Sequence, residues 1–113
     1  MKIIKTAILI AELKKMAKAR FGNLVKAVID IEKEIIALDA DLHADEEAFL
    51  LEKGSNQENL WGINLYPDVS GPDWIEYDSM INMRPSQKNF TRGVDDANIR
   101  NKIVSVVTKL VKR

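Results

Sequence analysis

The segment Leu24–His43, LVKAVIDIEKEIIALDADLH, decides the fold, because its apolar residues fit two different structures. A helix over this segment would carry one apolar stripe, made of Leu24, Val28, Ile31, Ile35, Leu38 and Leu42. A hairpin would instead alternate apolar and polar residues along two strands, with a turn at Glu32-Lys33-Glu34. The many β-branched residues favour strands, but the turn lacks the glycine or asparagine that hairpin turns prefer. The residues alone leave both structures open.

Two further strands are expected in the second half of the chain. LWGINLYP (Leu60–Pro67) alternates Trp61, Ile63 and Leu65 with smaller or polar residues, which is typical of a strand with one buried face. DWIEYDSMINM (Asp73–Met83) alternates in the same way. A segment with two prolines and a glycine separates them. We therefore expect these two strands to pair antiparallel.

Three helices are expected around these strands. Thr6 can cap a helix that runs to about Arg20, and ADEEAFLLEKG (Ala44–Gly54) has acidic residues at its start and glycine at its end. Asp95 or Asp96 can cap a last helix. That last helix carries a stripe that we expect to be buried: Ile99, Ile103, Val106, Val107 and Leu110.

With the hairpin, these elements make an α+β protein. We expect a single domain over residues 1–113, since this length suits one core. The expected architecture is an antiparallel sheet of about four strands with helices packed on one face.

The composition excludes several classes of function. Lys+Arg and Asp+Glu both number 17, so no overall basic field favours general nucleic-acid binding. The lack of cysteine excludes disulfides, zinc–thiolate sites and thiol nucleophiles. The first residues lack a signal-peptide pattern, and no stretch approaches the ~20 apolar residues that span a bilayer. We expect a cytoplasmic protein that does not enter a membrane.

Four short motifs stand out: His43-x-Asp45, Gly54-Ser55, Trp61-Gly62-x-Asn64 and Arg84-Pro85-Ser86-Gln87. Together they resemble a family of small bacterial and archaeal proteins recorded only as a domain of unknown function. The resemblance runs from about Leu24 to the last helix. Members of that family carry glycines around Glu34 and Asp39-Ala40, where this chain has none. Such glycines imply a hairpin, but the resemblance implies no activity, cofactor or catalytic residue.

The hairpin predicts a sheet with one apolar and one polar face. The apolar face would hold Ala27, Ile29, Ile31, Leu38, Leu42, Ile63, Leu65, Ile75 and Ile81. The polar face would hold Lys26, Asp30, Asp39, Asp41, His43, Asn64, Tyr66, Glu76, Asp78, Asn82 and Arg84. Such a polar face can simply lie in water, so it indicates a site only together with other features.

His43 is the only histidine, and it could act as a general base or a metal ligand near neutral pH. The neighbouring acidic residues Asp45, Glu46 and Glu47 suggest a hard metal, but they are equally explained as the start of a helix. We therefore predict no metal site and leave any cofactor unspecified. No nucleophile motif or glycine-rich phosphate loop is present.

The segment from Arg84 to Arg92 is the most suggestive part of the sequence for binding. Arginine presents a planar fork to carboxylates and phosphates, and functional residues concentrate on loops held by rigid elements. The candidate ligand-binding residues are Arg84, Ser86, Gln87, Arg92, His43, Asn64 and Tyr66. The alternative is a surface connection in which Arg84 pairs with Asp78 or Glu76.

Two classes of function follow from these residues. The first is a small binding or interaction module that holds an anionic small molecule or a protein partner. The second is a small enzyme in which His43 works with Asp45 or Asp78 while Arg84 binds an anionic substrate. The distance between His43 and Arg84 distinguishes them, because only the enzyme needs both in one cleft.

Overall fold

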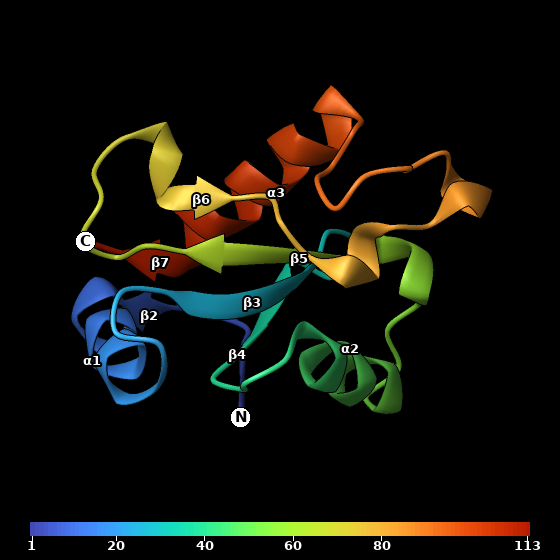
Figure 1. Ribbon diagram of the computed structural model, residues 1–113. Helices are drawn as coiled ribbons and strands as arrows, with labels where there is room; N and C mark the ends of the chain where they lie inside the picture. Colours follow the sequence, from blue (N-terminus) through green and yellow to red (C-terminus); the bar gives the residue numbers. More distant parts are fainter.

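The computed structural model describes residues 1–113, and its centre is a five-stranded antiparallel sheet (Figure 1). In spatial order the strands are Lys2–Ile4 (β1), Ile35–Leu38 (β4), Val25–Asp30 (β3), Leu60–Leu65 (β5) and Ile75–Glu76 (β6). Three helices pack against it: Ile10–Arg20 (α1), His43–Glu52 (α2) and Ala97–Leu110 (α3). The predicted α+β class with an antiparallel sheet is confirmed, with one strand more than expected. None of the helices combines the length and apolar character needed to cross a membrane.

The segment Leu24–His43 forms the hairpin rather than the helix. β3 and β4 pair antiparallel, with Ala27 opposite Leu38 and Asp30 opposite Ile35. β3 lies between β4 and β5 at the centre of the sheet, so side chains on both of its faces are buried. Burial of both faces explains why its sequence is nearly continuously apolar and fits a helical stripe as well.

Asp30 stabilises the hairpin turn, which contains neither the glycine nor the asparagine that such turns prefer. Its Oδ1 accepts hydrogen bonds from the backbone N–H groups of Glu32 at 3.0 Å and Lys33 at 2.9 Å. Glu34, at the end of the turn, has φ 56°, and Asp39, after β4, has φ 69°. These left-handed positions fall where the resembling family carries glycine, which adopts such angles without strain.

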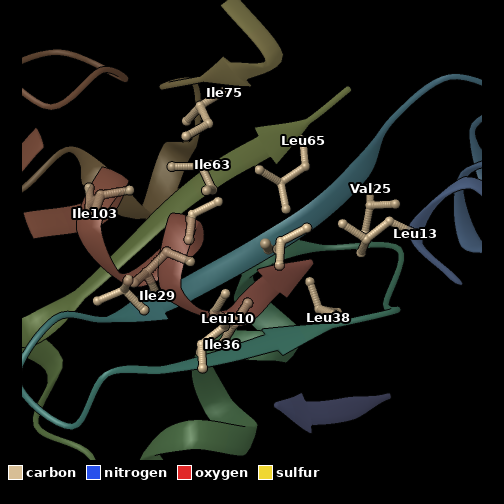
Figure 2. Close-up of a cluster of buried hydrophobic side chains, with 14 of the residues drawn as sticks. Leu13, Val25, Ile29, Ile36, Leu38, Ile63, Leu65, Ile75, Ile103 and Leu110 are labelled. Atoms are coloured by element: carbon tan, nitrogen blue, oxygen red, sulfur yellow. The ribbon is translucent and has the colours of Figure 1, made fainter. Parts of the chain in front are cut away.

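The main core lies between the sheet and helices α1 and α3. Figure 2 shows Ile103 and Leu110 of α3 among β-strand residues such as Ile29, Ile36 and Leu38. The buried residues of α1 are Leu13, Met16 and Ala17, and those of α3 are Ile103, Val106, Val107 and Leu110. The predicted stripe of the last helix is therefore buried, with Ile99 partly buried at its edge.

Most of the predicted apolar face is correct, with two exceptions. Leu42 is 54% exposed because the chain has already left the sheet there. Ile81 packs on the opposite side, against the small cluster that contains Val28 and Leu60. Its position follows from the short 3-10 helix Met80–Asn82 (η3), which ends the predicted alternation before Ile81.

The opposite face of the sheet is covered in part by α2, and not left to water. Val28, Ala37, Leu50 and Leu60 form a second, smaller buried cluster there. Figure 1 shows α2 and α3 with strands β3 and β5 between them. The helices were expected on one face, and this holds for α1 and α3 but not for α2. The sequence predicted this helix but not the face of the sheet that it covers, because the small cluster beneath it contains few apolar residues.

The predicted strand Asp73–Met83 is ordered as a strand only at Ile75–Glu76, where it pairs antiparallel with β5. Beyond it, the side-chain amide of Asn82 replaces the missing strand. Its Oδ1 accepts from the Gly62 N–H at 2.8 Å and its Nδ2 donates to the Gly62 carbonyl at 2.9 Å. A Cβ on Gly62 would lie 2.6 Å from the Cβ of Ser79, so only glycine allows this close approach.

The loop Ser79–Gly93 is polar because its side chains bond its own backbone. Asn89, 3% exposed, donates from Nδ2 to the carbonyls of Asn82, Thr91 and Gly93. Its Oδ1 accepts from the N–H of Asp95 at 2.8 Å. This buried network supplies the partners that a sheet would otherwise provide.

The two ends of the chain carry short strands that the sequence did not predict. α1 begins at Ile10, with no side-chain cap, and not at the expected Thr6. Before it, β2 (Ile8–Leu9) pairs parallel with β7 (Val111–Lys112). Strands of two or three residues are too short to show periodicity.

We expect Ile103→Ala to lower the free energy of unfolding by about 2–5 kcal/mol, because Ile103 is fully buried and its loss leaves a cavity. Urea denaturation measures this directly. Val104→Ala on the same helix is the control, since Val104 is 41% exposed and should change stability little. Equal effects of the two substitutions would show that α3 does not pack as described.

Candidate functional site

His43 is the first residue of α2 and is buried beside β5. Its Nε2 lies 2.8 Å from the backbone carbonyl of Ile63. A carbonyl can only accept, so Nε2 carries the proton and Nδ1 is the acceptor. Burial, opposed by this hydrogen bond, lowers the pKa of His43 below its ordinary 6.5. The ring is thus held neutral and in one tautomer.

His43 lines a small cavity of about 170 Å³, which we call the basic pocket. Its lining residues are Lys26, Leu42, His43, Ala44, Ser79, Met80, Ile81 and Arg92. Lys26 comes from β3, and Ser79 and Arg92 come from the polar loop. No acidic side chain lines the pocket.

Backbone and side-chain contacts hold the loop side of the basic pocket in place. The N–H of Ser79 donates to the carbonyl of Arg92 at 2.9 Å, which joins the two ends of the loop. The Oγ of Ser79 accepts from the Ile81 N–H at 3.3 Å, so its own proton remains available to a ligand. Arg92 Nε donates to Asp78 Oδ1 at 2.6 Å. This pair leaves the terminal nitrogens of Arg92 free.

The start of α2 adds further donors to the basic pocket. α2 begins after Leu42, which offers no side-chain oxygen to cap it. The first N–H groups of a helix have no partner within the helix, and the dipole makes them attractive to anions. His43 and Ala44, the first two residues of α2, both line the pocket. The hydroxyl of Ser79, the cations Lys26 and Arg92, and the start of α2 therefore all border the basic pocket.

Glu46, one turn after His43, is a fully buried acid on the same helix. Its Oε2 accepts from the Ala40 N–H at 3.3 Å, and its Oε1 has no partner. Burial raises the pKa of Glu46 to about 9, although that hydrogen bond and the charges of Lys26 and Arg20 oppose the shift. Glu46 is therefore protonated at neutral pH.

Arg84 points into the protein and away from the basic pocket. Its guanidinium donates to the backbone carbonyls of Gln57 and, at 2.8 Å, Leu60, and it lies 4.2 Å from the centre of the Trp61 ring. Only 9% of Arg84 is exposed, and burial lowers its pKa. The alternative, a pairing with Asp78 or Glu76, is absent as well. Arg84 ties the loop to the start of β5 and to the segment just before it.

The other predicted site residues lie in separate places. Asn64 and Tyr66 both donate to Glu76 Oε1, at 2.8 Å and 2.9 Å. Gln87 donates to the carbonyl of Glu58 at 3.0 Å, and Ser86 is exposed on a 3-10 helix. Of the seven candidates, the structure brings only His43 and Arg92 together in the basic pocket.

Sequence reasoning did not select Lys26 and Ser79 as site residues. Lys26 was expected on the polar face of the sheet, where its register opposite Asn64 puts it. Its proximity to Arg92 depends on the folding of the polar loop, for which the sequence has no simple pattern. No group of three His, Cys, Asp or Glu side chains is placed to hold a metal ion.

The fold and the basic pocket define a small α+β protein with an antiparallel sheet and a loop-covered cavity at a helix start. The model of the family described as "Protein of unknown function (DUF5674)" matches residues 2–110. The chain belongs to this family. No curated protein and no solved structure matches the chain.

We expect the single histidine to stay neutral on acidification to below pH 6.5, with the proton on Nε2. Nitrogen-15 NMR of histidine-labelled protein reports both the tautomer and the pKa. Because the folded pKa is the lower one, the unfolded chain takes up the proton first, and stability falls as the pH drops through and below 6.5. A ring that titrates at or above 6.5, or carries its proton on Nδ1, would contradict this geometry.

Proposed function

We propose that this protein is a small binding module that holds an anion in the basic pocket. One observation carries the proposal: every ionisable side chain lining this pocket is a base, namely Lys26, His43 and Arg92. Asp78 pairs with Arg92, so Lys26 is the lining cation that has no acidic partner, while the chain as a whole has equal numbers of acidic and basic residues. This local excess of positive charge needs an explanation. An anion bound there would provide one.

The size of the basic pocket limits the ligand. A cavity of about 170 Å³ suits a phosphate-, sulfate- or carboxylate-sized group, belonging to a small molecule or to a protein partner. Lys26 and Arg92 would supply charge, while Ser79 and the N–H groups at the start of α2 would supply directed hydrogen bonds. General nucleic-acid binding is not part of the proposal.

The position of Arg84 supports the module over the enzyme. The enzyme needs His43, a carboxylate and Arg84 around one substrate, but no cavity is lined by both His43 and Arg84. Asp45 is exposed, and Asp78 is paired with Arg92. These contacts offer no catalytic set that acts on a common atom.

We expect inorganic phosphate to bind in the basic pocket and to raise the pKa of His43, because a bound anion favours the imidazolium. NMR titration measures both the affinity and the histidine shift. Lys26→Gln and Arg92→Gln should each weaken binding by about 1.5–3 kcal/mol, or roughly 10- to 100-fold, through the loss of a charged hydrogen bond.

The matched control for these variants is Lys102→Gln, which removes an exposed charge on α3 away from the pocket. It should leave phosphate affinity unchanged. Phosphate that binds all four proteins equally, or that shifts resonances away from His43 and Ser79, would exclude the basic pocket as the binding site.

The proposal also holds that residues 1–113 fold as one domain and that the protein works in the cytoplasm. If the chain is a single domain, it should unfold in one cooperative transition. Cell fractionation tests the second.

A further inference from the structure

The largest cavity in the protein lies at the other end of α2 from the basic pocket. It has a volume of about 600 Å³, compared with about 170 Å³ for the basic pocket. It opens between β1, the turn of the hairpin and the second half of α2. We call it the lysine-rimmed groove. It is lined mainly by Ile3, Ile35, Phe49, Lys5, Lys33 and Lys53.

The floor of the lysine-rimmed groove is apolar. Ile3 of β1 and Ile35 of β4 are only partly buried, and both pack against the small cluster beneath α2. Phe49 of α2 is also partly buried. Apolar side chains that remain in water gain free energy when an apolar ligand covers them.

The rim of the groove carries only positive charge. Lys5, Lys33 and Lys53 all line it, whereas no acidic residue does. None of the three takes part in any ion pair of the structure. Unlike Lys2, Lys14 and Lys109, they have no acidic side chain to neutralise them.

Two of these lysines are held at the rim by neutral contacts. Lys33 Nζ donates to the carbonyl of Gly54 at 2.9 Å, which uses one of its three protons. Lys53 Nζ lies 5.5 Å from the centre of the Phe49 ring. Both ammonium groups are therefore positioned beside the apolar floor and still have donors to offer.

We propose that the lysine-rimmed groove binds a soluble amphipathic carboxylate. Its apolar chain lies on Ile3, Ile35 and Phe49, and its carboxylate accepts hydrogen bonds from the lysines. An apolar floor alone would bind any apolar molecule, and a basic rim alone would bind any anion. The combination selects a molecule that has both parts. This site does not depend on the anion proposed for the basic pocket.

Octanoate, used below its micelle-forming concentration, is the probe for the test. Nitrogen-15 NMR titration of the full chain should show shifts at Ile3, Ile35 and Phe49. Octanol has the chain without the charge, and acetate has the charge without the chain. We expect octanoate to bind at least about tenfold more tightly than either, since each lacks one of the two contributions. Equal binding of octanol and octanoate would overturn the proposal.

A double variant, Lys5→Gln with Lys53→Gln, should weaken octanoate binding by about tenfold or more while the melting temperature stays the same. Lys14→Gln with Lys102→Gln removes two exposed charges elsewhere and should bind octanoate like the unaltered protein. Unchanged binding by the first variant overturns the proposal, as do shifts confined to His43 and Ser79. Binding to vesicles of anionic lipid without binding to free octanoate would assign the groove to a membrane surface instead, and would also overturn it.

Discussion

Replacing Glu46 with glutamine should stabilise the protein by about 3–4 kcal/mol at pH 7. Glu46 is fully buried, and its pKa is raised from 4.5 to about 9. The folded state must therefore keep a proton that the unfolded chain releases at neutral pH. Each pH unit above 4.5 lowers stability by about 1.4 kcal/mol until the folded pKa is reached, and about 2.5 units separate 4.5 from pH 7. Glutamine is neutral at every pH and can still accept from Ala40.

Urea unfolding at pH 5, 7 and 8.5 measures this effect. Between pH 7 and 8.5, above the range in which His43 changes charge, the unaltered protein should lose stability as the pH rises, and Glu46→Gln should flatten the loss. At pH 5 the two proteins should differ least. Glu52→Gln, on the exposed part of the same helix, is the matched control. A gain from Glu46→Gln that is as large at pH 5 as at pH 8.5 would show that the carboxyl is not protonated in the folded state.

Asn82→Ala should destabilise the protein by about 2–6 kcal/mol, one of the largest losses expected from a single polar side chain. Asn82 is fully buried and satisfies the Gly62 N–H, the Gly62 carbonyl and, at 3.0 Å, the Arg92 carbonyl. Alanine leaves the Gly62 N–H and the Gly62 carbonyl without a partner, whereas the Arg92 carbonyl keeps its bond from the Ser79 N–H. Each buried unsatisfied group costs about 1–3 kcal/mol. Gly62 is in a central part of β5, so water cannot readily replace the amide.

Asn56→Ala is the control, because Asn56 is exposed and its side chain makes no hydrogen bond. Asn82→Asp separates the donor from the acceptor role of the amide. The carboxylate can still accept from the Gly62 N–H but would face two carbonyl oxygens, so a loss at least as large as that of alanine is expected. A loss below about 1 kcal/mol for Asn82→Ala would mean that the loop rearranges to supply other partners.

The sequence predicts those parts of the fold whose burial follows a regular period. α3 has an apolar stripe over four turns, and β5 alternates along its length, so both appear where expected. β6 does not extend to Met83, because Asn82 turns the chain and pairs with Gly62 through its side chain. A side chain that takes the place of a strand leaves no periodic pattern, and neither do strands of two residues.

In the candidate site, too, the sequence predicts some features and leaves others to the tertiary structure. His43 was selected because it is unique, and Arg92 because it lies in a loop rich in donors. Arg84 was expected to meet a ligand, but its neighbours Gln57 and Leu60 lie far away in the sequence, so the pattern did not reveal that their carbonyls occupy it. Charge and residue type thus identify candidates, while their partners depend on the tertiary structure.

The parallel pair of β2 and β7 has a consequence for how the chain folds. It places Ile8 beside Val111, and both side chains are buried in the main core. Contacts between residues so far apart in the sequence require closure of a very long loop. The chain loses the conformational entropy of closing this loop before the contacts can contribute any stabilising free energy. On a ribosome, this pairing must wait until β7 has emerged. Until then Ile8 lacks its partner strand, and the growing chain exposes apolar surface that the finished protein hides.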